Sequence, residues 1–316
     1  MSKNEARYLD MGDAWLEKLL VLIVTYNGVD TVADVLESCY QPGIEILVID
    51  NASIDGTREL ILKQRLPKLE LISSPHNIGV AAAYNLGLKQ ARKRGKSWIL
   101  ILDQDSLITG SAIHQLYDTA QELSRKGNPV GAIFPTIRSA HFPTVIHLPY
   151  YWTGKRLLQV TASAVMEGPI PVDSSITSGT LYRVEALMAT GGFCEPYFID
   201  FVDHECHIRM RQAGWSLWWE PRAELLHRLG EIQKMTAVGL WIEHSPYRYY
   251  YMARNMTRGY RKLGGMKALF YFWLEMLRHM KRLYCYGRQP GSCYGYILKG
   301  VLDGLRGIDG PLDPAV

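Results

Sequence analysis

Short runs of apolar residues alternate with amphipathic stretches along the first third of the chain. Polar or turn-forming residues bound each run, a pattern typical of strands buried on both faces of a sheet. Strands that alternate with helices favour a mostly parallel, right-handed α/β sheet. The predicted strands lie at 19–25, 44–50, 69–72 and 98–102, and the predicted helices between them at 30–40, 57–65 and 80–94.

The pattern is less regular after residue 105. Residues 135–172 mix proline, histidine, aromatic residues and glycine, and we expect antiparallel edge strands there. From Asp203 onward the mixture of polar and apolar residues fits a helix that this acid opens. The other predicted elements are helices at 111–126 and 184–189 and strands at 130–134, 176–183 and 215–220, the last continuing to 227.

Residues 266–286 predict an amphipathic helix near the end of the chain. Apolar residues at 266, 269, 270, 273, 277, 280 and 284 fall on one helical face, with charged residues on the other. A basic helix rich in aromatic residues is typical of attachment to an anionic membrane surface. Two alternatives stay open, because the apolar face can instead pack on the catalytic domain or on a second copy of the chain in a homo-oligomer.

Length and composition indicate a globular protein. The chain has 316 residues, of which 47% are hydrophobic and 21% charged, enough for one large domain with an appendage. We divide it into a lead-in (1–18), an α/β domain (19–240) and a helical, basic and aromatic C-terminal region (241–316). The net charge of +4 does not indicate nucleic-acid binding, and the surplus is local, since residues 254–299 hold ten Lys or Arg and one acid.

Cysteine usage and hydropathy favour a cytoplasmic location. The five cysteines include no C-x-x-C pair, which indicates a reduced protein without a disulfide framework or zinc site. The first residues are polar, and no stretch of about 18 uncharged apolar residues is present. We expect a cytoplasmic protein held peripherally on the inner face of the cytoplasmic membrane.

Acidic, amide and hydroxyl side chains directly follow three of the predicted strands. They lie at residues 25–27, 50–51 and 103–105, and the last group reads Asp103-Gln104-Asp105. The carboxyl ends of parallel strands meet at one edge, where open α/β sheets bind ligands. Two acids separated by one residue can share a hard cation such as Mg²⁺ or Mn²⁺ with substrate phosphates. A solvated turn would show the same pattern, so the motif alone leaves both interpretations open.

A second group of acids surrounds the start of the helix predicted at Asp203. This carboxylate suits an N-cap, and Glu205 with Arg209 suits an i,i+4 ion pair. The functional alternative makes Asp203 a general base aimed at a substrate hydroxyl. Farther along, His227 ends the last predicted strand. Its imidazole is either structural or a transition-metal ligand that completes the site at Asp105.

In combination, these motifs resemble the inverting family 2 glycosyltransferases of GT-A fold over about residues 19–230. Within that family the similarity is greatest to bacterial rhamnosyltransferases. The family-wide motifs are Val24-Thr-Tyr-Asn27, Val48-Ile-Asp-Asn51, Asn77-x-Gly79, Leu102-Asp-Gln-Asp105, Ser178-Gly179 and Phe201-Val-Asp203. The narrower similarity rests on Ile199-Asp-Phe-Val-Asp-His-Glu205, His227-x-Leu-Gly230 and Tyr250-Tyr-x-x-Arg254-Asn255.

The resemblance implies a Rossmann-like sheet with helices on both faces and a role for each motif. Asp105 and His227 would hold Mn²⁺ or Mg²⁺, and Asp203 would be the catalytic base. The nucleotide-sugar donor would contact Thr25, Tyr26, Asn27, Asp50, Asn51, Asn77, Gly79, Asp103, Gln104 and Asp105. The acceptor and the donor sugar would lie beside Ser178, Gly179, Asp200, Glu205 and Arg209.

The function that the resemblance implies is metal-dependent, inverting transfer of L-rhamnose from dTDP-β-L-rhamnose. The acceptor would be a saccharide or lipid-linked saccharide in cell-surface polysaccharide biosynthesis. One alternative is another donor, a UDP-hexose or UDP-galactofuranose. A sugar-phosphate nucleotidyltransferase would need a glycine-rich phosphate loop after the first strand, and residues 25–27 are not one. A non-catalytic protein that binds nucleotide sugars or membranes would have no need for Asp203.

Overall fold

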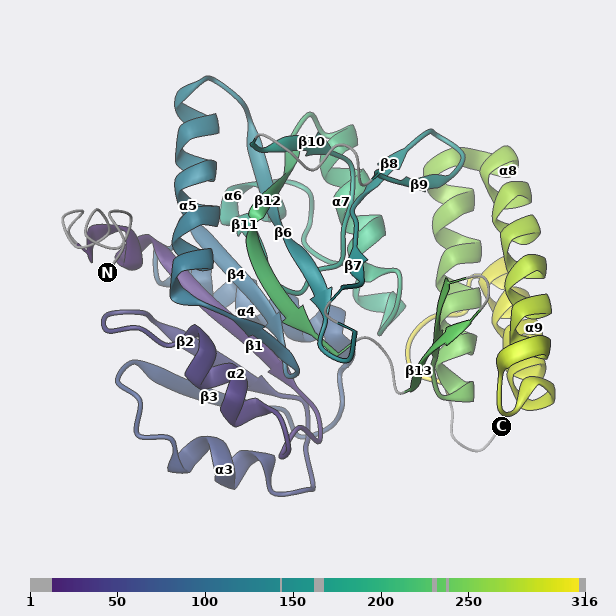
Figure 1. Cartoon of the computed structure of the whole chain (residues 1–316), viewed down its shortest axis with the longest axis horizontal. Helices are drawn as coiled ribbons and strands as arrows, with labels where there is room; N and C mark the ends of the chain where they lie inside the picture. The colour runs from purple at the N-terminus through teal and green to yellow at the C-terminus, as the bar shows by residue number, and fades with distance from the viewer. Residues whose placement is uncertain (1–12, 143, 162–167, 229–231, 237–238, 313–316) are drawn as a thin grey trace.

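A mixed ten-stranded sheet forms the centre of the molecule in the computed structural model, which describes residues 13–142, 144–161, 168–228, 232–236 and 239–312. The strand order is β10-β12-β6-β11-β4-β1-β2-β3, with β5 paired to β12 and β7 to β6 (Figure 1). Two small hairpins, β8–β9 and β13–β14, stand apart from it. The strands are β1 (Leu19–Thr25), β2 (Ile46–Asp50), β3 (Leu69–Ser73), β4 (Trp98–Asp103), β5 (Ser106–Ile108), β6 (Val130–Ser139), β7 (Ile146–His147), β8 (Tyr150–Trp152), β9 (Leu157–Gln159), β10 (Ile170–Val172), β11 (Thr180–Arg183), β12 (Ser216–His227), β13 (Ile232–Thr236) and β14 (Gly239–Glu243).

The parallel half of the sheet confirms the alternating pattern of the sequence. Strands β3, β2, β1 and β4 are all parallel, and every residue of β1 is buried. The register pairs Thr25 with Asp50 and Val24 with Asp103. The polar residues that follow these strands therefore lie together at one edge.

Strand β11 enters the other half of the sheet antiparallel, between β4 and β6. The sequence predicts this strand from residue 176, whereas it begins only at Thr180. The reason lies at Gly179, whose φ of +78° is a left-handed conformation. A Cβ there would lie 2.8 Å from Pro135 Cγ, so the chain turns closely against β6 before the strand starts.

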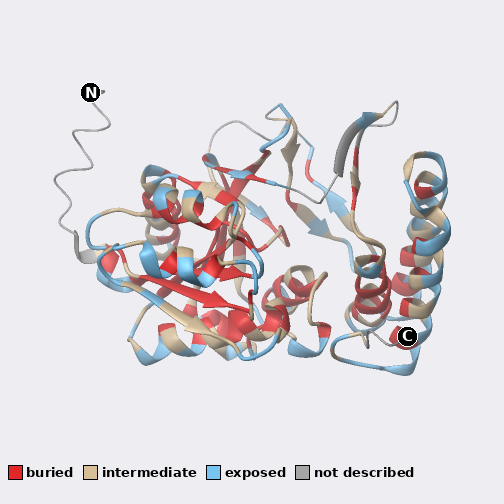
Figure 2. Ribbon diagram, turned by 90° about the horizontal axis from the view of Figure 1, so that it is seen from below, coloured by how far each residue is buried: buried red, intermediate tan, exposed pale blue. Residues whose placement is uncertain are grey.

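Helices cover both faces of the sheet, as expected for this class. Alternate residues of β1 point to opposite cores: Leu20 and Leu22 pack with α4, α6 and α7, while Val21 and Ile23 pack with α2 and α5. Figure 2 shows the buried strands between these layers. The helices are η1 (Asp13–Lys18), α2 (Val32–Cys39), α3 (Thr57–Lys63), α4 (Gly79–Lys93), α5 (Gly110–Arg125), α6 (Val184–Ala189), η3 (Glu195–Tyr197), α7 (Val202–Gln212), α8 (Pro246–Tyr286) and α9 (Pro290–Arg306).

The C-terminal region is more extensively helical than the sequence predicts. The helix predicted at 266–286 is the second half of α8, which is broken at Gly265 (φ 69°, ψ −163°), and α9 was not predicted. Residues Tyr260, Leu269 and Phe272 of α8 join the hydrophobic core on one face of the sheet. The C-terminal region therefore shares part of the core of the α/β domain, and the boundary expected near residue 240 stays a prediction.

The predicted apolar face of 266–286 is split between the interior and the surface. Leu269 is fully buried, whereas Met266, Phe270, Leu277 and Tyr284 are 67%, 58%, 63% and 74% exposed. Among the described residues, no helix combines the length and apolar character needed to cross a membrane.

The predicted lead-in is tied to the domain at its end. Residues 13–18 form the short helix η1, and Leu16 packs into the core beneath α2. The remainder of the lead-in, residues 1–12, lies outside the described residues.

Candidate functional site

A cleft of about 690 Å³ opens at the carboxyl ends of β1, β2 and β4. It brings together predicted site residues from across the chain. The carboxyl ends of the strands are also where α/β sheets bind ligands. A second hollow of about 640 Å³, beside Ser97 and Arg183, contains none of them. The predicted residues that line the cleft are Thr25, Tyr26, Asn51, Asn77, Gly79, Asp103, Gln104, Asp105, Asp200, Asp203 and His227.

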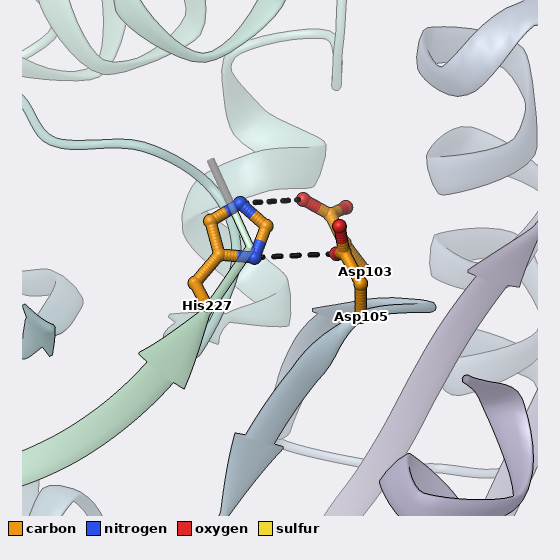
Figure 3. A group of neighbouring side chains, drawn as sticks. All are labelled: Asp103, Asp105 and His227. Carbon is orange, nitrogen blue, oxygen red and sulfur yellow. Dashed lines mark ion pairs between the residues drawn. The ribbon is translucent and has the colours of Figure 1, made fainter. Parts of the chain in front are cut away.

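Asp103, Asp105 and His227 converge in this cleft as a set of metal ligands (Figure 3). One ligand atom from each lies within 4.8 Å of the others. His227 Nδ1 is 3.2 Å from Asp105 Oδ1, and His227 Nε2 is 4.0 Å from Asp103 Oδ2. Two carboxylates and one imidazole suit Mn²⁺ or Mg²⁺, so the donor set fits the predicted cation.

The charges of this triad perturb one another. Burial raises the pKa of Asp103, and the nearby carboxylates of Asp105 and Asp203 add to the rise against the lowering effect of His227. Burial lowers the pKa of His227, but Asp105 and Asp103 outweigh it, so the net shift is upward. Crowded acids beside a buried imidazole are an arrangement that a divalent cation would stabilise.

Three hydroxyl groups support the triad, and of these the sequence singled out only Ser178. Ser178 donates to Ser106 Oγ at 2.6 Å, and Ser106 Oγ lies 2.7 Å from His227 Nδ1. Tyr84 donates to Asp103 Oδ1 at 2.9 Å. These contacts orient the His227 ring and the Asp103 carboxylate, as hydrogen-bond partners of metal ligands do. Ser178 therefore acts from outside the cleft lining, although the sequence places it beside the sugars.

The loops after β1 and β4 are joined by the side chain of Gln104. Its Oε1 accepts from Thr25 Oγ1 at 2.9 Å and from the backbone N–H of Tyr26 at 2.6 Å. In the same way Asn51 donates to Asn77 Oδ1 at 2.9 Å and joins the loops after β2 and β3. These side chains hold the expected nucleotide end of the cleft together.

Two residues predicted at the nucleotide end, Asn27 and Asp50, are not among those that line the cleft. Asn27 Oδ1 accepts from the N–H of Ile54, and the carboxylate of Asp50 accepts from the N–H of Ser53. Arg58 Nε lies 3.7 Å from the same carboxylate. Both side chains therefore shape the loop that carries the site, and neither is among the cleft-lining residues.

Asp203 occupies the second position of α7, at the mouth of the same cleft. The sequence suggested a helix opened and capped by this acid, whereas the helix begins at Val202 and its N-cap is Phe201. Asp203 Oδ1 accepts from the N–H of His204 at 2.8 Å. Its charge reaches across the cleft, because it contributes to the raised pKa of Asp103. The carboxylate thus faces the same space as the triad.

The segment just before α7 has an unusual backbone. Phe198, Asp200 and Phe201 adopt positive φ values of 66°, 65° and 62°. Such conformations cost on the order of 1–3 kcal/mol per residue unless the surroundings impose them. Gly79 allows this segment to approach, since a Cβ on it would lie 2.5 Å from the Phe198 ring. The segment connects the start of α4 to the start of α7.

Glu205 and Arg209 form the ion pair that helical spacing allowed. Arg209 Nη2 donates to Glu205 Oε2 at 2.8 Å, and Lys262 Nζ lies 3.0 Å from Glu205 Oε1. Burial acts to raise the pKa of Glu205, but the two cations outweigh it and lower the pKa. Arg209 also donates to the carbonyls of Thr190 and Gly192. Neither residue lines the cleft. Their contacts attach α7 to Thr190, Gly192 and Lys262.

Three residues that line the cleft, Arg248, His147 and His204, were not predicted as site residues. Arg248 of α8 donates to Asp200 Oδ1 at 2.6 Å. The charge of Asp200 raises the pKa of Arg248. His147 and His204 line the same cleft. Burial and the neighbouring histidines lower the pKa of His147 to about 4. An arginine in a generally basic segment and isolated histidines are too common to be identified from sequence alone.

Comparisons with known proteins agree with this geometry. The family model described as Glycosyl transferase family 2 matches residues 20–186. The dTDP-rhamnosyl transferase RfbF of Shigella flexneri is 27% identical over 75% of this chain and 78% of its own length. The N-acetylglucosaminyl-diphospho-decaprenol L-rhamnosyltransferase of Mycobacterium tuberculosis is 28% identical over 58% of this chain and 66% of its own length.

A solved structure supports the fold. The mannosyltransferase PcManGT from Pyrobaculum calidifontis, in complex with GDP-Man and Mn²⁺, superposes with a TM-score of 0.56. The alignment covers 91% of this chain and 87% of that chain at 16% sequence identity. At this identity the likeness concerns the arrangement of the backbone alone.

Proposed function

The chain belongs to glycosyl transferase family 2, and from this premise we propose that it transfers L-rhamnose from dTDP-β-L-rhamnose to a lipid-linked saccharide with inversion at the anomeric carbon. The observation that carries the proposal is one cleft holding Asp103, Asp105 and His227 together with Asp203. Two relatives of the chain bear rhamnosyltransferase names. The product would enter cell-surface polysaccharide biosynthesis.

In this proposal the donor lies along the strand ends. Thr25, Tyr26, Asn51 and Asn77 contact the nucleoside, and Gly79 lines the part of the cleft that receives the diphosphate. Asp105 and His227 would hold a divalent cation, whose charge would stabilise the departing diphosphate. Asp103, fixed by Tyr84, faces the ribose or the sugar.

Asp203 acts as the general base. The acceptor hydroxyl oxygen forms a bond to the anomeric carbon while the bond from that carbon to the diphosphate oxygen breaks. The hydroxyl proton passes to Asp203, and the electron pair of the broken bond leaves with dTDP. The proposed chemistry needs one base and no carboxylate nucleophile, so a single displacement inverts the anomeric centre. The cleft orients the reacting groups, which is the other large contribution to rate.

The donor is tested by a panel of nucleotide sugars with Mn²⁺ or Mg²⁺ present. With an N-acetylglucosaminyl-diphospho-lipid of short chain as acceptor, we expect kcat/KM for dTDP-rhamnose to exceed those for UDP-glucose and UDP-galactofuranose by about 10-fold or more. The readout is release of the nucleoside diphosphate. A preference for a UDP-sugar would show that the proposed donor is wrong, and the protein would still be a glycosyltransferase. Failure of every nucleotide sugar to bind would contradict the proposed function.

We further propose that α8 attaches the protein to the inner face of the cytoplasmic membrane. Met266, Phe270, Leu277 and Tyr284 form an exposed apolar stripe, and Lys281 lies beside it on the helix. Aromatic and aliphatic side chains next to basic ones match the boundary of an anionic bilayer. This placement would bring a lipid-linked acceptor close to the cleft.

Vesicle sedimentation tests this attachment. We expect the protein to sediment with phosphatidylglycerol-containing vesicles at low salt, and Phe270→Asp with Leu277→Asp to weaken partitioning by about 10-fold or more. Leu62→Asp is the matched control, because Leu62 is 71% exposed on the distant helix α3. Sedimentation that is absent, or equal in the double variant and the control, would contradict the attachment.

A further inference from the structure

Two neighbouring residues of α8 bind the backbone of the segment that precedes the proposed base. Asn255 Nδ2 lies 2.9, 2.6 and 2.9 Å from the carbonyl oxygens of Tyr197, Ile199 and Asp200. Arg254 Nη2 donates to the carbonyl of Tyr197 at 3.0 Å. Both side chains are fully buried. A helix distant in sequence therefore contacts three carbonyls of one short loop, those of Tyr197, Ile199 and Asp200.

The two side chains are themselves fixed. Arg254 Nε donates to Asn255 Oδ1 at 3.0 Å, so the amide nitrogen of Asn255 faces the loop. Arg254 Nη1 donates to the carbonyl of Gly310 at 2.6 Å, and its guanidinium lies over the rings of Tyr250 and Tyr251. This network orders the pair before any ligand arrives.

The loop they hold is the strained one. Phe198, Asp200 and Phe201 are left-handed there, a conformation that persists only where the surroundings impose it. Asn255 satisfies the carbonyl of Asp200 within this turn, and Phe201 stacks on Tyr260, also of α8. Helix α7 begins at the next residue, so the turn sets the direction in which that helix leaves.

The same loop touches both halves of the cleft. On the donor side, the carbonyl of Phe198 accepts from the N–H of Val80 at 2.8 Å, at the start of α4. On the other side, Asp200 holds Arg248 and the chain continues to Asp203. A small rotation of this turn would move the carboxylate relative to the bound donor, and misplacement of about 1 Å can cost about 10²-fold in rate.

We propose that Arg254 and Asn255 are positioning residues that hold the left-handed turn at 197–201 and thereby aim Asp203 at the acceptor hydroxyl. Neither residue lines the cleft, so they act through the turn and not on the substrate. The proposal rests on the proposed function for the role of Asp203. It also gives the C-terminal helices a part in catalysis that is independent of membrane attachment.

The test compares Asn255→Ala with Thr257→Ala. Thr257 is equally buried on the same helix but packs against Gly304 of α9, so its variant controls for loosened helix packing. We expect Asn255→Ala to lower kcat by about 30- to 100-fold while the Kd of dTDP with Mn²⁺ changes less than about threefold. Thr257→Ala should keep kcat within about twofold.

Amide hydrogen exchange provides a readout that needs no substrate. Asn255→Ala should speed exchange in residues 196–203 more than Thr257→Ala does. If Asn255→Ala does not fold, Arg254→Lys replaces it, because lysine keeps the charge but cannot contact the same carbonyls; we expect about a 10-fold loss of kcat and the same exchange pattern.

Two results would overturn the positioning role. One is equal exchange at 196–203 in Asn255→Ala, or in its lysine substitute, and Thr257→Ala. The other is a loss of kcat matched by an equal loss of dTDP affinity. Wild type and Asp203→Asn are assayed in parallel: if Asp203→Asn retains full turnover, the base assignment fails, whereas the exchange result still decides whether the pair holds the turn.

Discussion

Replacing Asp203 by Asn should lower kcat by about 10²-fold or more and leave the Kd of dTDP-rhamnose with Mn²⁺ near the wild-type value. The amide can keep the contact that the Oδ1 atom makes with the N–H of His204, at 2.8 Å, but cannot accept the proton of an acceptor hydroxyl. Steady-state transfer and calorimetric titration of the donor measure the two quantities. A loss in kcat without a loss in binding is the signature of a group needed only in the transition state.

Glu185→Gln is the matched control for this variant. Glu185 is the second residue of α6, as Asp203 is of α7, and it is exposed outside the cleft. It therefore removes a carboxylate from the same helical position, where the charge favours the helix N-terminus. The control should keep wild-type turnover. Turnover that persists in Asp203→Asn would remove this residue from the role of base.

Replacing Asp105 by Ala should abolish the dependence of donor binding on a divalent cation. In the wild type we expect EDTA to weaken dTDP binding by about 10²-fold or more, since the cation neutralises the diphosphate. The variant should bind dTDP equally weakly with Mn²⁺ and with EDTA. Asp105 Oδ1 lies 3.2 Å from His227 Nδ1, so this carboxylate and the imidazole can share one cation. Removing the carboxylate removes one of its ligands.

Two further variants complete this test. His227→Ala should also weaken the response to Mn²⁺, because it removes the imidazole from the group of candidate ligands. Asp118→Ala removes an acid from α5, where it pairs with His114 away from the cleft, and should keep the response to Mn²⁺. Binding that stays dependent on Mn²⁺ in Asp105→Ala would contradict its role as a ligand.

The parallel half of the fold could be predicted because its signal is local. Strands β1, β2 and β4 are apolar runs that end in a polar residue, and the amphipathic helices between the strands leave few other arrangements. The same logic placed Asp50 and Asp105 at one edge of the sheet, after β2 and β4, which lie on either side of β1. The candidate metal ligands Asp105 and His227 could be proposed because carboxylates and imidazoles bind divalent cations.

The C-terminal region could not be predicted in the same way. Its helices are joined at Gly265 and pack by small residues, so Gly300 approaches the carbonyl of Tyr250 closely enough that a Cβ would lie 2.3 Å from it. Such contacts depend on which helix packs opposite, and the sequence of one helix does not indicate its packing partner. The local basic surplus did not distinguish Arg254 from the other cations, yet Arg254 is fully buried and bonded to carbonyls.

Asp105 and His227 were predicted from the sequence as metal ligands, whereas the residues that hold the site in place were not. Ser106, Tyr84 and Arg248 act through partners far away in the sequence, and a hydroxyl or a guanidinium fits many roles. For Glu205 and Arg209, helical spacing alone indicated an ion pair, and the structure has that pair. Residues whose role depends on a neighbour from another element need the fold before they can be interpreted.

The most direct test of the account is a crystal grown with dTDP and Mn²⁺, in which anomalous scattering locates the metal. We expect a single strong peak beside Asp105 and His227, next to the diphosphate of dTDP and in the cleft that Asp203 also lines. A peak held by other residues, or dTDP bound in another part of the molecule, would contradict it.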